Sequence, residues 1–180
     1  MSKFIEIEAK YLLNKEDFIK LHQYLKLDDQ KSFVQNNEYL DTLDQHLREK
    51  AWMLRIRTIG TQKELTLKKP LKEGMEETNI PISAEEYQKI IKTGRVPLTG
   101  LEKLKFVVIG RLLTKRISCP YEGGELFLDE NYYRSLYDYE VEYEVKDSLE
   151  RAKKTLEELF DKLEISSYRP SRSKNYRCCY

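Results

Sequence analysis

Residues 4–10 read FIEIEAK, a stretch in which charged and apolar side chains alternate. Successive side chains in a β-strand point to opposite faces, so Glu6, Glu8 and Lys10 share one face of a predicted strand and the apolar residues share the other. A charged strand face is usually solvated, because antiparallel sheets commonly expose one side to water. Whether this charged face is solvated or functional therefore depends on which residues the rest of the chain places beside it.

Further segments of the chain alternate with a period of two, which is typical of strands. They are 31–41, 52–60, 63–69, 74–82, 107–119, 125–133 and 137–145. Amphipathic helices are predicted after Asn14, after Ser83 and from about Ser148, each beginning at a residue that can cap it. About eight strands with few helices favour a mostly β fold of the α+β class, either an antiparallel sandwich or a closed barrel. The helices should pack on the apolar strand faces, which leaves the charged faces pointing away from them.

The bulk composition favours one domain over residues 1–180. Lys and Arg total 32 and Asp and Glu total 31, so the net charge of +1 gives no overall field for a nucleic acid or a membrane surface. No apolar run approaches the length of a membrane span, and the first residues do not resemble a secretory signal. The cysteines are Cys119, Cys178 and Cys179, an odd number without C-x-x-C spacing, so we expect reduced thiols and a cytoplasmic protein.

The charged faces differ in sign from strand to strand. Arg55 and Arg57 share a face of one predicted strand, whereas Glu140, Glu142 and Glu144 share a face of another. Grouped carboxylates repel one another unless cationic groups compensate them, and their oxygens suit hard divalent ions such as Mg²⁺ or Mn²⁺. The guanidinium fork suits phosphate oxygens. If the strands close into a barrel with these faces inward, the lumen would bind a metal complex of a polyphosphate.

Several motifs resemble, in the same order, those of the CYTH or triphosphate tunnel metalloenzyme superfamily. They are Glu6-x-Glu8-x-Lys10, Tyr39-Leu-Asp-Thr, Leu54-Arg55-Ile-Arg57, Leu65-Thr-Leu-Lys68, and then Arg116, Asp129 and Glu142-x-Glu144. The resemblance covers residues 4 to about 145 and is greatest to small bacterial stand-alone CYTH proteins of Firmicutes type. It implies an eight-stranded antiparallel closed barrel, or tunnel, with a charged lumen and helices on the outside. The activities that it implies are triphosphatases and a class IV adenylate cyclase, all of which use a divalent metal.

Strand alternation and the resemblance together give the candidate site. The predicted catalytic residues are Glu6, Glu8, Lys10, Glu142 and Glu144. The predicted phosphate-binding residues are Lys10, Arg55, Arg57, Lys68, Arg116 and Lys174. The predicted ligands for Mg²⁺ or Mn²⁺ are Glu6, Glu8, Glu77, Asp129, Glu140, Glu142 and Glu144.

Alternation also decides between neighbouring charged residues. Glu77 should point inward and Glu76 outward, while Arg116 should point inward and Lys115 outward. At the position of Thr114, members of the family that the motifs resemble have a basic residue. The basic segment 169–180 could supply the missing charge through Lys174 or Arg177, although a solvated tail or a weak RNA contact accounts for it equally well.

The predicted function is metal-dependent hydrolysis of a triphosphate with release of phosphate. One alternative is an adenylate cyclase, in which the ribose 3′-hydroxyl replaces water, and another is a module that binds a phosphorylated ligand without turnover. The phosphate loop, the dinucleotide-binding glycines and the hydrolase nucleophile elbow are absent from the sequence. We expect a small-molecule triphosphate partner and no specific nucleic acid or membrane partner. The substrate, the preferred metal and the oligomeric state stay open.

Overall fold

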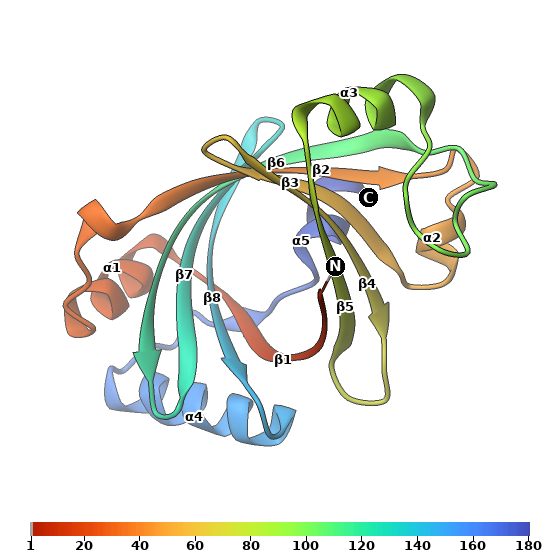
Figure 1. Ribbon diagram of the computed structural model, residues 1–180. Coiled ribbons are helices and arrows are strands. Elements are labelled where there is room, and N and C mark those ends of the chain that lie inside the picture. Colours follow the sequence, from red (N-terminus) through yellow and green to blue (C-terminus); the bar gives the residue numbers. More distant parts are fainter. Residues whose placement is uncertain (1) are drawn as a thin grey trace.

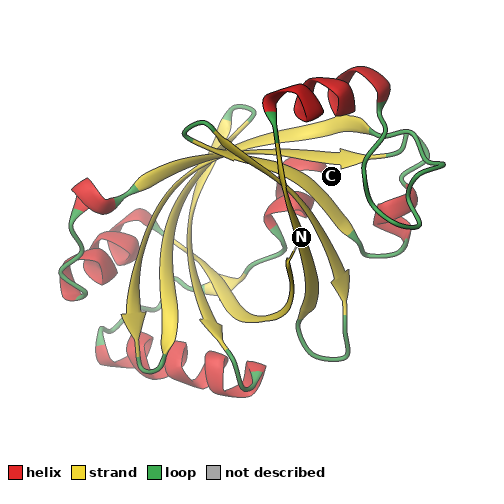
Figure 2. Ribbon diagram, viewed as in Figure 1, coloured by secondary structure: helices red, strands yellow, loops and turns green. Residues whose placement is uncertain are grey.

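The chain forms a closed antiparallel barrel in a computed structural model that describes residues 2–180 (Figure 1, Figure 2). The strands are β1 (Ser2–Leu13), β2 (Phe33–Asp41), β3 (Met53–Ile59), β4 (Gln62–Pro70), β5 (Met75–Ile82), β6 (Val107–Tyr121), β7 (Gly124–Tyr133), β8 (Leu136–Val145) and β9 (Arg169–Pro170). Neighbouring strands follow the order β5-β4-β3-β2-β6-β7-β8-β1, and β1 also pairs with β5. The predicted eight-stranded antiparallel barrel is therefore confirmed, with the short β9 added beside β1.

Strand β1 closes the barrel. Its first half, from Ser2 to Glu6, pairs with β5, and its second half, from Ile7 to Leu13, pairs with β8. Within the FIEIEAK stretch, the partner strand of β1 changes from β5 to β8. Its charged face is thereby placed between the strands that carry Lys68 and Glu77 on one side and Glu142 and Glu144 on the other.

The helices are α1 (Lys15–Tyr24), α2 (His46–Glu49), α3 (Ala84–Thr93), α4 (Leu149–Lys162), α5 (Lys174–Cys179) and a 3-10 helix, η1 (Asp29–Lys31). The three predicted helices begin at the predicted caps: Asn14 and Ser148 accept backbone hydrogen bonds, and Ser83 forms a capping box with Glu86. Helices α2, α5 and η1 were not predicted, because they have 4, 6 and 3 residues and are too short to show a periodic apolar stripe.

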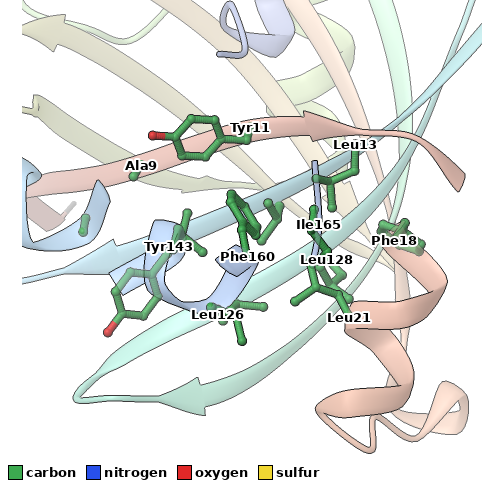
Figure 3. Packing of buried hydrophobic residues seen from close by; sticks show 14 of the residues in the cluster. Ala9, Tyr11, Leu13, Phe18, Leu21, Leu126, Leu128, Tyr143, Phe160 and Ile165 are labelled. Atoms are coloured by element: carbon green, nitrogen blue, oxygen red, sulfur yellow. The ribbon is translucent and has the colours of Figure 1, made fainter. Parts of the chain in front are cut away.

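The main apolar core lies between the barrel wall and helices α1 and α4 (Figure 3). Ile7, Ala9 and Tyr11 of β1 are buried there against α4 residues such as Phe160. Full burial of a side chain of this kind stabilises a fold by about 1.5–3 kcal/mol. A second cluster joins β3 and β4 to α3 and the segment that follows it. These two cores orient the sheet, because they hold its apolar face outward and its charged face inward.

Two features differ from the predicted arrangement of helices and strands. Ile5 is 62% exposed rather than covered by a helix, because it lies in the part of β1 that pairs with β5, before the buried stretch that begins at Ile7. Helix α5 does not pack on the outside with α1, α3 and α4; it lies within the ring of strands in the view of Figure 1. Its Lys174 and Arg177 contact carboxylates on β7 and β8. None of the helices in residues 2–180 combines the length and the apolar character needed to cross a bilayer.

Candidate active site

The barrel lumen holds a cavity of about 650 Å³, whose lining comes from strands on all sides of the barrel and from α5. The predicted site residues that line it are Glu6, Glu8, Lys10, Arg55, Arg57, Lys68, Glu77, Arg116, Glu142 and Lys174. The remaining three are next to it in the sheet. Glu144 lies across from Glu8, and Asp129 lies across from both Arg116 and Glu140. The register of the barrel therefore gathers the predicted strand residues around one lumen, and α5 brings Lys174 to them.

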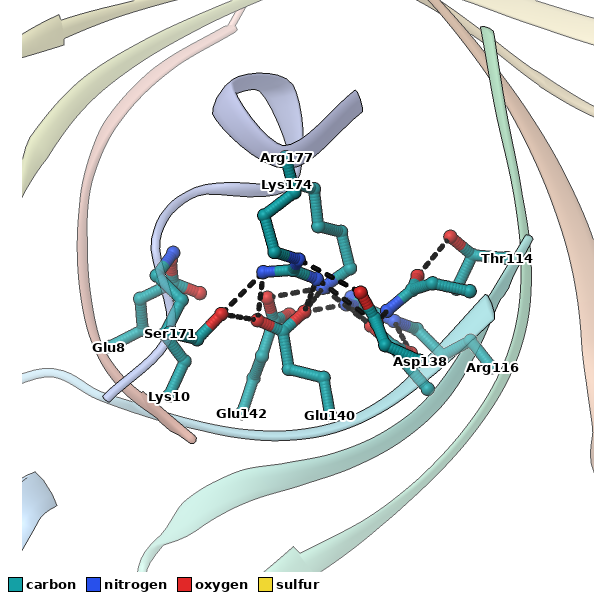
Figure 4. Close-up of polar contacts among 12 residues, drawn as sticks. Glu8, Lys10, Thr114, Arg116, Asp138, Glu140, Glu142, Ser171, Lys174 and Arg177 are labelled. Atoms are coloured by element: carbon teal, nitrogen blue, oxygen red, sulfur yellow. Dashed lines mark hydrogen bonds and ion pairs between the residues drawn. The ribbon is translucent and has the colours of Figure 1, made fainter. Parts of the chain in front are cut away.

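One group of three carboxylates, called here the paired acidic trio, consists of Asp129, Glu140 and Glu142. Three cationic side chains compensate it (Figure 4). Arg116 donates two hydrogen bonds to Asp129, at 2.7 and 2.6 Å, and also contacts Glu142. The Lys174 amine lies 2.8 Å from Asp129 and 2.5 Å from Glu142 and also contacts Glu140. Arg177 donates to both oxygens of Glu140, at 2.9 and 3.2 Å.

These contacts keep Asp129 and Glu142 ionised although both are buried. Burial alone would raise the pKa of Asp129, but Arg116 and Lys174 outweigh it and hold that pKa below its usual value. Burial acts in the same direction on Glu142, where Lys174, Arg116 and Lys10 lower the pKa well below its usual value. The pKa of Lys174 is raised, because the three carboxylates outweigh the effect of its burial. Charge is thus balanced within this group.

A second group, called here the open acidic trio, consists of Glu6, Glu8 and Glu144. Lys10 contacts Glu8, while Lys68 contacts Glu6 but also lies 2.7 Å from Glu77. Burial raises the pKa of Glu8 despite the nearby Lys10. The pKa of Glu144 is raised to about 7 by burial and by the negative charge of Glu6 and Glu8. The open acidic trio therefore carries negative charge that the protein does not fully compensate.

The open acidic trio has the composition of a site for a hard cation. Each of its carboxylates offers an oxygen, and the three oxygens lie within 4.8 Å of one another. Carboxylate oxygens are the donors that Mg²⁺ and Mn²⁺ prefer, and a cation would relieve the repulsion that raises the pKa of Glu144. Residues and charge therefore fit a divalent metal at this place.

Two arginines on β3 carry charge of the opposite sign. The buried Nε of Arg55 has no hydrogen-bond partner among residues 2–180, and its Nη2 lies 4.0 Å from Glu77. Arg57 donates from Nε to the neutral Asn37 at 2.9 Å. Burial, together with the charges of Arg55 and Arg116, lowers the pKa of Arg57 to about 9. An anion with several oxygens would supply the acceptors and the negative charge that this pair lacks.

The predictions from strand alternation are confirmed. Glu77 is buried and accepts a hydrogen bond from Asn79, whereas Glu76 forms an exterior ion pair with Lys3 at 2.8 Å. Arg116 points into the lumen, while the Lys115 amine lies 3.4 Å from Glu130 on the outer face. Thr114 is also buried and donates a hydrogen bond to Asn131 at 2.7 Å, so a neutral pair occupies that position.

Some lumen residues were not singled out from the sequence. Asp138 shares the strand face of Glu140 and accepts a hydrogen bond from Arg177 at 3.0 Å. Asn37 shares the face of Tyr39 and accepts from Arg57. Alternation alone could have found both residues. Ser171, which donates to Glu140 at 2.5 Å, lies in an irregular segment where the sequence gives no comparable signal.

A closed antiparallel barrel whose lumen carries separate acidic and basic groups defines the tunnel class that the sequence motifs indicate. The model of the CYTH domain family matches residues 5–173, so this chain belongs to the CYTH family. Its similarity extends to a Bacillus subtilis (strain 168) protein named "Putative triphosphatase YjbK", which is 33% identical over 153 residues, or 82% of this chain and 80% of that protein.

Solved structures show the same architecture. A Bacillus halodurans crystal structure described as "a putative adenylate cyclase" is 34% identical, with a TM-score of 0.88 over 98% of both chains. The Hippeastrum protein HpAC1 is 24% identical, with a TM-score of 0.74 over 96% of this chain and 94% of that one, and shares the fold.

Proposed function

We propose that this protein is a divalent-metal-dependent hydrolase that releases phosphate from a triphosphate. The observation that carries the proposal is the separation of uncompensated charge within one lumen. The buried Nε of Arg55 has no acceptor in the part of the chain that the structure describes, and burial and neighbouring positive charge lower the pKa of Arg57. Burial and neighbouring negative charge raise the pKa of Glu144 in the open acidic trio. A metal–triphosphate complex matches both, because it presents phosphate oxygens to the arginines and a cation to the carboxylates.

The proposed metal ligands are Glu6, Glu8 and Glu144, with Mg²⁺ or Mn²⁺ as the cofactor. When bound, the cation would offset phosphate charge and lower the pKa of a water molecule that it holds. Asp129, Glu140 and Glu77 already compensate cationic side chains of the protein, so we assign them to positioning those cations instead. Glu142, the member of the paired acidic trio that lies across from Lys10, orients Arg116 and Lys174 toward the lumen.

The basic residues of the lumen would hold the triphosphate chain. Arg55, Arg57 and Lys68 approach from β3 and β4, and Arg116 approaches from β6. Arg116 is well suited to a fixed role, because its two hydrogen bonds to Asp129 hold the plane of its guanidinium group. Lys10 reaches the same cavity beside Glu8, where it would bind a phosphate oxygen or tune the charge of the acid.

Hydrolysis adds water to the terminal phosphorus and breaks its bond to the bridging oxygen. Negative charge then shifts toward the leaving phosphate. Preorganised cations that contact that phosphate stabilise this shift more than they stabilise the ground state, which is the usual source of catalysis in phosphoryl transfer. The arginine pair supplies cations of this kind, because burial fixes Arg55 and the hydrogen bond to Asn37 fixes Arg57 before substrate binds.

An adenylate cyclase is the second candidate, favoured by the 34% identical Bacillus halodurans structure described with that activity. The two reactions share the metal and the phosphate-binding residues and differ in the nucleophile. A module that binds without turnover is the third. Uncompensated carboxylates favour an enzyme over this module, since phosphate binding alone would require mainly the basic residues.

One assay separates the candidates. The purified chain is incubated with tripolyphosphate, ATP or thiamine triphosphate, each with Mg²⁺, Mn²⁺ or EDTA, and phosphate, pyrophosphate and cyclic AMP are measured. The proposal predicts phosphate release that requires metal. Pyrophosphate with cyclic AMP would indicate the cyclase instead, and saturable binding without any product would indicate the binding module.

A matched pair of arginine variants tests the site within this assay. Arg57→Ala should lower kcat/KM strongly, because it removes a cation that lines the cavity at the phosphate position. Arg111→Ala is the control, since Arg111 is an exposed arginine on the outer face of β6 that contacts Glu38. Equal activity of the two variants would contradict the assignment of phosphate binding to the lumen.

A further inference from the structure

The vicinal cysteines Cys178 and Cys179 lie at the end of α5, against the wall of the barrel. Cys178 is 1% exposed, and its thiol donates to the carbonyl oxygen of Arg111 on β6 at 3.2 Å. Cys179 is half-buried. Neither thiol has a role in the proposed reaction, although the helix that carries both also carries Lys174 and Arg177.

Gly110 on β6 makes room for both sulfur atoms. A Cβ atom at this position would lie 3.0 Å from the Cys178 sulfur and closer still to the Cys179 sulfur. Gly110 lies within β6, beside a break in the register between β2 and β6, and it is not in the left-handed region, so no left-handed turn accounts for the glycine. A glycine inside a strand often marks the close approach of another group, and here that group is the thiol pair.

The two thiols also behave electrostatically as one unit. A hydrogen bond from Cys179, with help from Arg134 and Arg177, lowers the pKa of the Cys178 thiol. The same hydrogen bond and burial raise the pKa of Cys179. The buried sulfur of lowered pKa therefore lies directly beside a second sulfur, which is the arrangement of a dithiol.

We propose that Cys178 and Cys179 form a dithiol site for a thiophilic compound of the trivalent arsenical class, and that filling this site loosens α5. Thiolates are the protein ligands that soft ions prefer. An arsonous acid, R–As(OH)₂, reacts with both thiols: two S–H and two As–O bonds break, two As–S bonds form, and two water molecules leave. No oxidant is needed, since no atom changes its oxidation state.

A bridging arsenic atom fits this pair of thiols better than a direct disulfide bond does. Adjacent Cα atoms are about 3.8 Å apart across a trans peptide, whereas ordinary disulfides need about 4.4–6.8 Å, so a bond between the two sulfurs would be strained. An inserted atom lengthens the bridge and relieves this strain. The arsenical would react first with the half-exposed Cys179, and the buried Cys178 would then complete the chelate.

The consequence for the lumen follows from the position of the cysteines in α5. Arg177 immediately precedes Cys178 and donates to both oxygens of Glu140, and Lys174 begins the same helix and contacts the paired acidic trio. The space beside Gly110 holds the two sulfurs closely, so an added atom with its substituent must displace the end of α5. Backbone hydrogen bonds such as that from Tyr180 to Tyr176, at 3.0 Å, should then open more often.

Binding is tested by mass spectrometry on the full chain treated with phenylarsine oxide and then washed with a monothiol or with a dithiol. We expect one arsenical per chain that survives the monothiol and is removed by the dithiol. The adduct should persist in Cys119→Ser and disappear in both Cys178→Ser and Cys179→Ser. Loss of the wild-type adduct to the monothiol, or its loss in Cys119→Ser, would overturn the site. Because the buried Cys178→Ser variant could misfold, the half-exposed Cys179→Ser variant carries the test, with circular dichroism as its folding control.

Coupling to α5 is tested by hydrogen exchange of residues 174–180 with and without the arsenical. Faster exchange confined to this helix is expected, and unchanged exchange in a chain that carries the adduct would refute the coupling. Neither measurement involves triphosphate turnover. Failure of the proposed hydrolase would therefore leave both readouts intact, and failure of the dithiol site would leave the hydrolase assay intact.

Discussion

The open and the paired acidic trios are made of the same chemical groups on neighbouring strands, yet their charges are handled in opposite ways. In the paired acidic trio, Arg116, Lys174 and Arg177 compensate the carboxylates, and the pKa values of Asp129 and Glu142 are lowered. In the open acidic trio, the pKa values of Glu8 and Glu144 are raised. A cluster of carboxylates is therefore not by itself a metal site; what matters is the charge left over after the protein's own cations are counted.

The two trios also contribute differently to folding. Breaking a buried ion pair leaves an uncompensated charge and is strongly destabilising, so the paired acidic trio should be important for stability. Repulsion within the open acidic trio works against the fold, which is typical of groups that serve a ligand rather than stability. Four changes, ordered from the largest expected effect to the smallest, test this division.

The largest effect is expected for Glu144→Gln in the open acidic trio. Losing one proposed metal ligand should lower metal-dependent turnover about a thousandfold, which corresponds to about 4 kcal/mol of transition-state stabilisation. The thermal stability without metal should stay the same or rise, because the substitution removes a repelling charge. Steady-state kinetics at saturating Mn²⁺ and thermal unfolding in EDTA measure the two effects. Normal turnover would remove Glu144 from the metal site.

The matching substitution in the paired acidic trio, Glu140→Gln, should act mainly on stability. Glu140 is fully buried, and it contacts both Lys174 and Arg177. Neutralising it leaves buried positive charge uncompensated, and we expect the free energy of unfolding to fall by about 3 kcal/mol. Urea denaturation measures this loss. If Glu140→Gln is as stable as the wild type while Glu144→Gln is destabilised, the assignment of the two trios is reversed.

A third test uses pH, because the trios should titrate in different ranges. The folded pKa of Glu144 is about 7, above its ordinary value of 4.5, so this group favours the fold below pH 4.5 and that contribution is lost as the pH rises through 7. The pKa of Asp129 is lowered below its ordinary value of 3.8, so its contribution is present above pH 3.8 and is lost as the pH falls through the folded pKa. Between pH 5 and pH 8, the open acidic trio should therefore dominate the titration.

Protons and metal should then compete for the open acidic trio. Below pH 7, the apparent affinity for Mn²⁺ should weaken by up to about tenfold per pH unit, because Glu144 must lose its proton to bind the ion. Over the same range, the metal-free protein should become more stable as the pH falls. Calorimetric titration at several pH values measures the affinity, and Glu144→Gln should flatten its pH dependence. A steep dependence that persists in this variant would point to another group.

The closed barrel was predicted from the motif resemblance, whereas the direction of most charged residues was predicted from strand alternation alone. A strand has a period of two, so the direction of Glu77 against Glu76, or of Arg116 against Lys115, follows from position alone once one face is known. Residues on the apolar face, such as Ile7, show which face turns toward the helices. The same rule would have placed Asp138 and Asn37 in the lumen had it been applied to every strand position.

The difference between the two trios could not be predicted in this way. Alternation shows that a glutamate points inward but not which cation reaches it. The compensating Lys174 and Arg177 come from a helix of 6 residues, more than thirty positions after Glu140 and Glu142, whose location depends on tertiary contacts. The sequence therefore assigned to the metal all the acids that it predicted to point inward, and only the ion pairs divide them.

The smallest effect is expected for two adjacent glutamates, of which Glu76 points to the barrel exterior and Glu77 points into the lumen. Glu76→Gln removes an ion pair with Lys3 on the barrel exterior, and exposed pairs of this kind contribute about 0.5 kcal/mol or less. Glu77→Gln weakens buried contacts with Lys68 and Asn79, and since hydrogen bonds to charged groups contribute about 1.5–3 kcal/mol, it should cost clearly more. Urea denaturation at low and high salt measures both variants, and only the exterior pair should be sensitive to salt. Equal losses would mean that the lumen is solvated like the outer surface, and then the raised pKa of Glu144 could not mark a metal site.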